Sequence, residues 1–321
     1  MSNPEESNEL IKVDSQDKSL ISYIPSPFVV ASLPTRAVKN VPFVRKFNNI
    51  TMTLNGVGQI PYGKNGRLLL SIFTTYAVIS KNVDDKNNVI INYRSIKELL
   101  DELGLPTSRT TEIKEQLDYF SKSNFVFEQK ITQVVEKKYA ANLFGDLEEV
   151  PQQIPVDITS TGIIPFFSGA VKIETVDTNK KSCAFSIILA PQFTQYCREH
   201  SVPINYTVYK EISSALGKDL YVWLTYRNNA LIESNNKDGV FIPYDALVNQ
   251  FMPVGEDSGR TQVRTNYDYI KELIINIKNN YYKDLNINFR SDGTGLDLFP
   301  SKPQILDNDK RYVLLTSDMK V

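Results

Sequence analysis

A glycine-rich stretch, GVGQIPYGKN, is the first feature of the sequence that could carry chemistry. Gly58, Gly63 and Lys64 give it the Gly-x-x-x-x-Gly-Lys frame of a loop that binds nucleotide phosphates. However, Asn65 stands where a Ser or Thr hydroxyl would ligate Mg²⁺, and Pro61 has no backbone N–H to offer a phosphate. We therefore interpret the stretch as a structural loop that begins a helix and holds the N-terminal segment against the first domain.

Residue types that often catalyse reactions are scarce. The chain has one histidine, His200, and two cysteines, Cys183 and Cys197. So few side chains cannot build a histidine-rich metal site or a zinc site. We predict a protein that is not an enzyme and has no metal or cofactor. His200 is expected to end a helix, because the C-terminus of a helix favours a cation.

The net charge of −1 hides an uneven distribution. Residues 21–140 carry 16 Lys and Arg and 10 Asp and Glu, whereas residues 1–20 carry 2 and 5, and residues 141–180 carry 2 and 6. A second basic patch, residues 258–290, has six Lys and Arg and three acids. Such patches favour a nucleic-acid partner.

The second patch contains the residues best suited to double-stranded DNA. Arginine can bridge both major-groove acceptors of guanine, and the first residues of a recognition helix reach the bases. We predict base or near-base contacts from Arg260, Gln262 and Arg264, and phosphate contacts from Lys271 and Arg290. Thr261 and Thr265, which lie opposite the apolar stripe of the same predicted helix, complete the candidate set. The alternative is an ordinary solvated helix face.

A weaker candidate set precedes it in the chain. The predicted DNA-binding residues there are Ser108, Arg109, Thr110, Lys114 and Lys130. Three acids on the same helix would repel phosphates, while Lys130 and two further lysines lie on strands that we interpret as a wing. This region could bind DNA or serve as a dimer surface, and the sequence leaves both open.

The elements that must position these residues follow one order twice. Helical periodicity over residues 66–81 is followed by the strand-like VIINYR, a helix that starts at the capping box Ser95–Glu98 and stops at Gly104, a second helix, and strands over 124–140. Helix, strand, helix, turn, helix and hairpin is the layout of a winged helix.

The second half repeats this order, from a long helix through VFIPY to a hairpin with Asp-Gly at its tip. At an offset of 151, Tyr93 matches Tyr244 and Arg109 matches Arg260. We predict an α+β protein of two tandem winged-helix domains with an N-terminal extension. The expected parts are a disordered acidic tail (1–30), the first domain (31–200), the second domain (201–305) and a C-terminal tail (306–321).

Several separated motifs, ASLPTR, IPYGKNGRLLLSIFTTYAV, LGL and KDLYVWLTYR, resemble the RepA-type plasmid replication initiators. The resemblance spans roughly residues 31–235. It implies a tandem winged-helix protein that binds repeated DNA sites at its origin, starts replication with host proteins, and often binds its own promoter as a dimer. Lys218 departs from the pattern, because a smaller apolar residue is expected there.

The leading hypothesis is therefore a plasmid replication initiator that binds repeated double-stranded sites and recruits host replication proteins, and that also regulates its own gene. A homodimer, DNA-bound monomers or both would act. The alternatives are a dimeric winged-helix repressor and, remotely, an NTPase that uses residues 58–65. No apolar run approaches the ~20 residues of a membrane span, and the acidic N-terminus is no signal peptide, so we predict a cytoplasmic protein without membrane contact.

Overall fold

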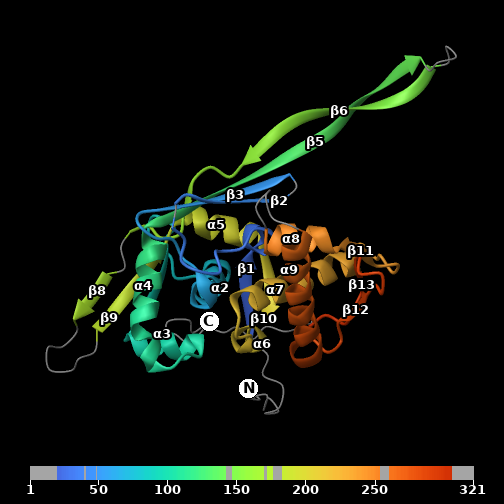
Figure 1. The fold of residues 1–321 in the computed structure, drawn as a ribbon. Coiled ribbons are helices and arrows are strands. Elements are labelled where there is room, and N and C mark those ends of the chain that lie inside the picture. Colours follow the sequence, from blue (N-terminus) through green and yellow to red (C-terminus); the bar gives the residue numbers. More distant parts are fainter. Residues whose placement is uncertain are drawn as a thin grey trace, which may run out of the picture.

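The computed structural model describes residues 20–39, 41–47, 49–141, 147–169, 172–175, 183–253 and 260–305. The described residues combine helices with sheets whose strand pairs are antiparallel, which confirms the α+β class (Figure 1). The tails 1–19 and 306–321 lie outside the described residues.

The second half of the molecule folds as a winged helix. Its elements are α7 (Ala215–Glu233), β11 (Val240–Pro243), α8 (Tyr244–Phe251), α9 (Arg260–Asn276), β12 (Asn286–Phe289) and β13 (Gly295–Phe299). The sheet order β11-β13-β12 pairs the first strand with the last, and β12 and β13 form the wing. This is the predicted order, and a π-helical turn (Ile277–Tyr281) extends α9.

The first half contains the same unit. It comprises α2 (Gly63–Ile79), β4 (Val89–Tyr93), α3 (Ile96–Leu103), a 3₁₀ turn (Thr107–Arg109), α4 (Thr110–Ser121), β8 (Lys172–Thr175) and β9 (Cys183–Leu189). The sheet order β4-β9-β8 matches that of the second unit. The Ser95 half of the predicted capping box holds, because the Ser95 hydroxyl accepts the Glu98 N–H at 3.3 Å, and Gly104 ends α3 with φ 66°. The Glu98 carboxylate accepts the Arg94 N–H at 2.7 Å.

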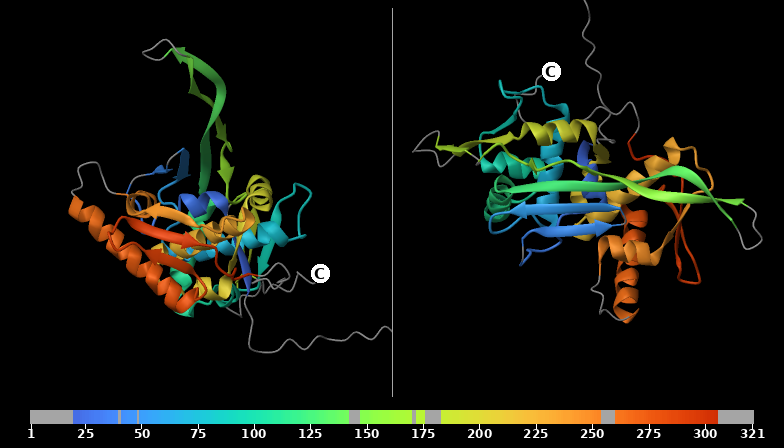
Figure 2. Two further views of the ribbon diagram at one scale, coloured as in Figure 1. Left: turned by 90° about the vertical axis from the view of Figure 1, so that its right-hand side faces the viewer. Right: turned by 90° about the horizontal axis from the view of Figure 1, so that it is seen from above.

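The predicted wing of the first unit was wrong. Residues 123–141 form one long strand, β5 (Ser123–Ala141), which pairs with β6 (Leu147–Ser160) and β3 (Ile50–Gly56) in the sheet β2-β3-β5-β6. β2 (Phe43–Phe47) is the edge strand, and β7 (Ile164–Pro165) pairs with the base of β5. The β5–β6 ribbon projects far beyond the helices (Figure 2). The wing is β8–β9 instead.

The N-terminal extension is partly ordered. Residues that were predicted to lie in the tail 1–30 form β1 (Ile21–Pro25) and α1 (Ser26–Val30), which are apolar and largely buried. β1 pairs with β10 (Ser201–Asn205), which lies between α5 (Pro191–Glu199) and α6 (Tyr206–Glu211). The predicted tail was therefore too long, because the apolar residues from Ile21 onwards form buried elements.

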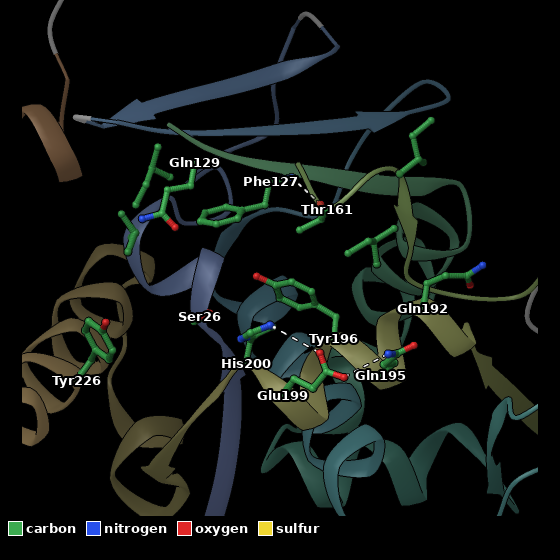
Figure 3. A pocket seen from close by; sticks show the side chains of 14 residues that line it. Ser26, Phe127, Gln129, Thr161, Gln192, Gln195, Tyr196, Glu199, His200 and Tyr226 are labelled. Carbon is green, nitrogen blue, oxygen red and sulfur yellow. Dashed lines mark hydrogen bonds and ion pairs between the residues drawn. The ribbon is translucent and has the colours of Figure 1, made fainter. Parts of the chain in front are cut away.

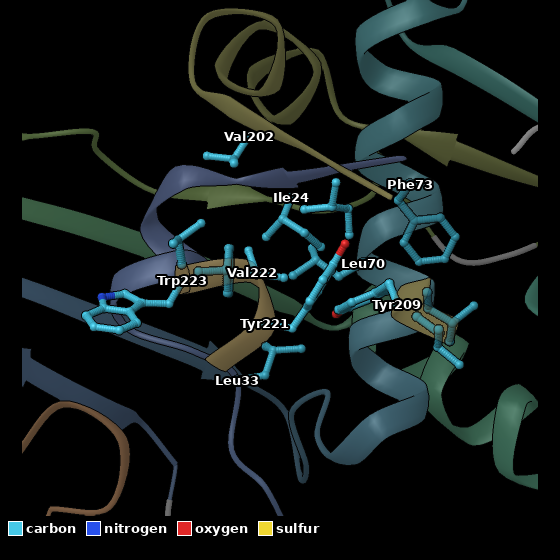
Figure 4. Close-up of a cluster of buried hydrophobic side chains, with 14 of the residues drawn as sticks. Ile24, Leu33, Leu70, Phe73, Val202, Tyr209, Tyr221, Val222 and Trp223 are labelled. Atoms are coloured by element: carbon cyan, nitrogen blue, oxygen red, sulfur yellow. The ribbon is translucent and has the colours of Figure 1, made fainter. Parts of the chain in front are cut away.

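One hydrophobic core runs through both units. Tyr221, Val222 and Trp223 of α7 lie among side chains of β1 and α2, such as Ile24 and Leu70 (Figure 4). The two winged-helix units therefore share packing across the expected boundary at residues 200 and 201.

The loop with the Gly-x-x-x-x-Gly-Lys frame connects the N-terminal segment with α2 and α7. Gly63 begins α2 with φ 69° and donates its N–H to the Pro34 carbonyl at 2.9 Å. Arg67, which is 2% exposed, binds Asp219 of α7 through two hydrogen bonds of 2.6 Å and also donates to the carbonyls of Leu33 and Pro34. These contacts fasten the N-terminal segment to α2 and α7, as the sequence predicted.

Candidate nucleic-acid interface

Helix α9 divides its side chains between the core and the solvent. Tyr267, Ile270 and Ile274 are at most 1% exposed and pack inside the second unit. The exposed side chains of the first two turns are those of Thr261, Gln262, Arg264 and Thr265. These turns carry no acid before Asp268. The N-terminal part of α9 is thus a polar, uncharged to basic surface, as a groove-binding helix requires.

Arg264 and Lys271 lie on the side of α9 that faces the wing. A Cβ added to Gly293, at the wing tip, would lie 2.9 Å from Nη1 of Arg264. The Nζ atom of Lys271 is 5.2 Å from the ring centre of Phe289 on β12. Arg264 also pairs with Asp268 at 3.3 Å, with both side chains about half exposed. Arg264 and Lys271 therefore both adjoin the wing.

Arg290 occupies a different surface from the one expected for a phosphate contact beside α9. On β12 and β13 the core-facing side chains are Ile287, Leu296 and Leu298, and Arg290 alternates to the other face of the sheet. There its guanidinium binds Asp297 at 2.8 Å and stacks 3.8 Å from the ring centre of Phe241. The hydrogen bond to Asp297 raises the pKa of Arg290.

Arg260 is the first residue of α9, and its side chain is outside what the structure describes. Thr265 donates its hydroxyl hydrogen to the Thr261 carbonyl at 2.9 Å, and both threonines are exposed. Around the helix axis, the two threonines lie between Gln262 and Arg264.

A buried residue that the sequence reasoning missed supports Gln262. Asn266 is 6% exposed, accepts a hydrogen bond from Gln262 Nε2 at 2.8 Å and donates from Nδ2 to the Met252 carbonyl at 3.1 Å. The spacing i, i+4 of an amide pair is visible in the sequence. The carbonyl at the end of α8 is not, because only the fold brings it there.

The candidates of the first unit are dispersed. Ser108 and Arg109 belong to the 3₁₀ turn, whereas Thr110 and Lys114 belong to α4, and all four lie at one end of this helix. Arg109 pairs with Glu112 at 2.8 Å on the surface. Lys130 lies on β5, opposite Ile158 of the ribbon, so it is not part of the wing.

A cavity of about 600 Å³ lies between α5 and the sheet of β3 and β5, and its lining includes no residue of α4 or α9 (Figure 3). His200 ends α5 as predicted and contacts Tyr196, with ring centres 4.8 Å apart. Glu199 lies 3.8 Å from Nε2 of His200 and accepts a hydrogen bond from Gln195 at 3.2 Å. Glu199 therefore has both His200 and Gln195 as partners at this cavity.

Within the described residues, no three His, Cys, Asp or Glu side chains are placed to hold a metal ion. Over the same part of the chain, none of the helices has the length and apolar character needed to traverse a membrane.

Fold and surface together define a protein of two winged-helix units, the second of which presents a polar and basic face on α9. Residues 170–246, from β8 to the start of α8, match the family described as plasmid encoded RepA protein. This match confirms the resemblance to RepA-type plasmid replication initiators that the sequence motifs indicated. No curated protein matches the sequence.

Among solved structures, domains 2 and 3 of RctB resemble the chain. A selenomethionine form has 10% identity and a TM-score of 0.46, and covers 86% of this chain and 98% of that chain. A second structure of RctB domains 2-3 has 8% identity and a TM-score of 0.42, and covers 85% and 96%.

Proposed function

We propose that this protein initiates plasmid replication by binding repeated double-stranded DNA sites at the origin and recruiting host replication proteins. It also binds the promoter of its own gene, and it catalyses no reaction itself. The observation that carries the proposal is the exposed start of α9, which presents Gln262, Arg264 and Thr265, has no acid before Asp268, and adjoins the wing tip through Arg264. The family match of residues 170–246 supports the initiator role.

The two units are proposed to divide the work. The second unit reads bases, because its first two helical turns are free of carboxylates. On α4 of the first unit, Glu112, Glu115 and Asp118 are at least partly exposed, and Arg109 is already paired with Glu112. The first unit therefore adds few base contacts, and either its wing meets the other half of a site or its surface forms a homodimer.

Footprinting of the DNA that flanks the gene tests this function. We expect several protected sites in tandem, about twenty base pairs apart, each contacted on one face of the duplex. Binding should weaken steeply between about 50 and 200 mM salt, because phosphate contacts release counterions. A single protected palindrome would instead identify a dimeric repressor, and equal affinity for random duplexes would contradict sequence-specific binding.

A further inference from the structure

We propose that Asn266 fixes the orientation of the Gln262 amide so that Gln262 reads adenine. The proposal rests on the DNA-binding function proposed above and assigns a base to one of its contacts. Three groups carry it: the Met252 carbonyl at the end of α8, the buried Asn266 amide and the exposed Gln262 amide.

The orientation of both amides follows from what each atom can do. A backbone carbonyl only accepts hydrogen bonds, so the side chain of Asn266 must turn its NH₂ group towards Met252. Its oxygen then faces Gln262, which must turn its own NH₂ group inwards. A reversed Gln262 would place two oxygens against each other. The Oε1 atom of Gln262 is therefore held outwards.

Burial makes this arrangement rigid. Asn266 is 6% exposed, so water cannot readily replace its two partners, and an unpaired amide there would be costly. Gln262 is exposed and is the third residue of α9, so it lies within the turns that a recognition helix inserts into the groove.

The outward groups of Gln262 select one base. Its oxygen needs a donor, and the second hydrogen on Nε2 needs an acceptor. In the major groove only adenine offers both on one base edge, the N6 amino group and N7. Guanine presents two acceptors, thymine an acceptor and a methyl group, and cytosine a donor alone. Asn266 itself reaches no base and acts as a positioning residue.

The experiment measures binding of the full chain to an origin duplex in which single adenines are replaced by 7-deazaadenine, which lacks the N7 acceptor. For the wild type we expect one adenine per site at which this replacement weakens binding roughly tenfold. Gln262→Met, similar in length but without an amide, should reduce that penalty to less than twofold. Asn266→Leu should reduce it to less than about threefold while other base pairs keep their penalties.

The double variant Gln262→Met/Asn266→Leu separates positioning from folding. If Asn266 acts through Gln262, the double variant shows the same base penalties as Gln262→Met alone. Thermal unfolding and affinity for random duplex report on the fold, and Asn266→Ser replaces Asn266→Leu if the latter unfolds. Full adenine discrimination in Asn266→Leu or Asn266→Ser, or the absence of any adenine whose penalty depends on Gln262, would overturn the proposal. Wild-type protein that binds origin and random duplexes equally would instead refute the proposed function.

Discussion

Arg264 and Arg290 carry the same charge in different surroundings. Arg264 is paired with Asp268 at 3.3 Å and lies between α9 and the wing tip, whereas Arg290 is held by Asp297 and Phe241 on the opposite face of the sheet. We expect Arg264→Ala to weaken specific binding by about 1–3 kcal/mol and to relax discrimination at one base pair. Arg290→Ala is the matched control and should change binding by less than half as much. Titrations with specific and random duplexes check this, and equal losses on both duplexes would make Arg264 a phosphate contact.

Lys218 is buried, with its ammonium hydrogen-bonded to the Tyr209 carbonyl and 4.4 Å from the centre of the Tyr209 ring. Burial, with Lys64 and Arg67 nearby, lowers the pKa of Lys218 to about 7. Because this pKa is below its unfolded value, the unfolded chain binds more protons, and stability rises with pH above about 7.

We therefore expect the free energy of unfolding to increase by about 2 kcal/mol between pH 7 and pH 9 through this group. Lys218→Met should be more stable than the wild type near pH 6 and should lack this increase. The exposed Lys114→Met serves as the control. Urea unfolding at several pH values measures the effect, and the same pH dependence in wild type and Lys218→Met would contradict it.

At the scale of single residues, the sequence indicated which side chains of α9 are exposed, but it did not indicate which groups contact them. The exposed start of α9 follows from helical periodicity, since Tyr267, Ile270 and Ile274 define the buried side. The pairing of Arg290 and the support of Gln262 by Asn266 depend on which strand and which carbonyl lie nearby. Those neighbours are set by tertiary packing and leave no local pattern.

At the scale of elements, the main correction concerns the first wing. Because Lys137 and Lys138 lie on the β5–β6 ribbon and not on the wing, we expect the double variant Lys137→Gln/Lys138→Gln to keep the salt dependence of origin binding. By contrast, Lys271→Ala should lower the slope of log affinity against log salt by about one. Titrations at four salt concentrations measure both, and a loss of about two units in the double variant would restore the ribbon to the interface.

The helices and the second wing were predictable because capping and periodicity are local signals. Ser95 and Gly104 mark both ends of α3, and the Asp-Gly turn marks the β12–β13 hairpin. The prediction of a wing over residues 124–140 failed because the alternation of β5 fits either a short wing or a long ribbon. The choice depends on β3, whose sequence ITMTLNG alternates polar and apolar residues, ends in glycine, and pairs with residues 123–129 of β5.

At the scale of the whole molecule, the two winged-helix units are joined by shared burial. The Arg67–Asp219 pair links α2 to α7, and Tyr221 and Trp223 extend the core towards α1 and α8. Substitutions in this joint should destabilise the whole chain, since removing one partner leaves a buried charge. We expect Arg67→Met to lower the free energy of unfolding by about 3–5 kcal/mol in one transition for both units. Two separate unfolding transitions in the wild type would contradict a common core.

In the proposed function, the exposed start of α9 enters a DNA groove. The most direct measurement is a footprint of the origin region with the wild type and with Thr261→Glu/Thr265→Glu, which places two carboxylates on the exposed face of the helix without changing its buried side. We expect protection to disappear while the thermal unfolding temperature changes little, because carboxylates there would face phosphates and bases. Undiminished protection by a folded double variant would show that the DNA-binding surface lies elsewhere.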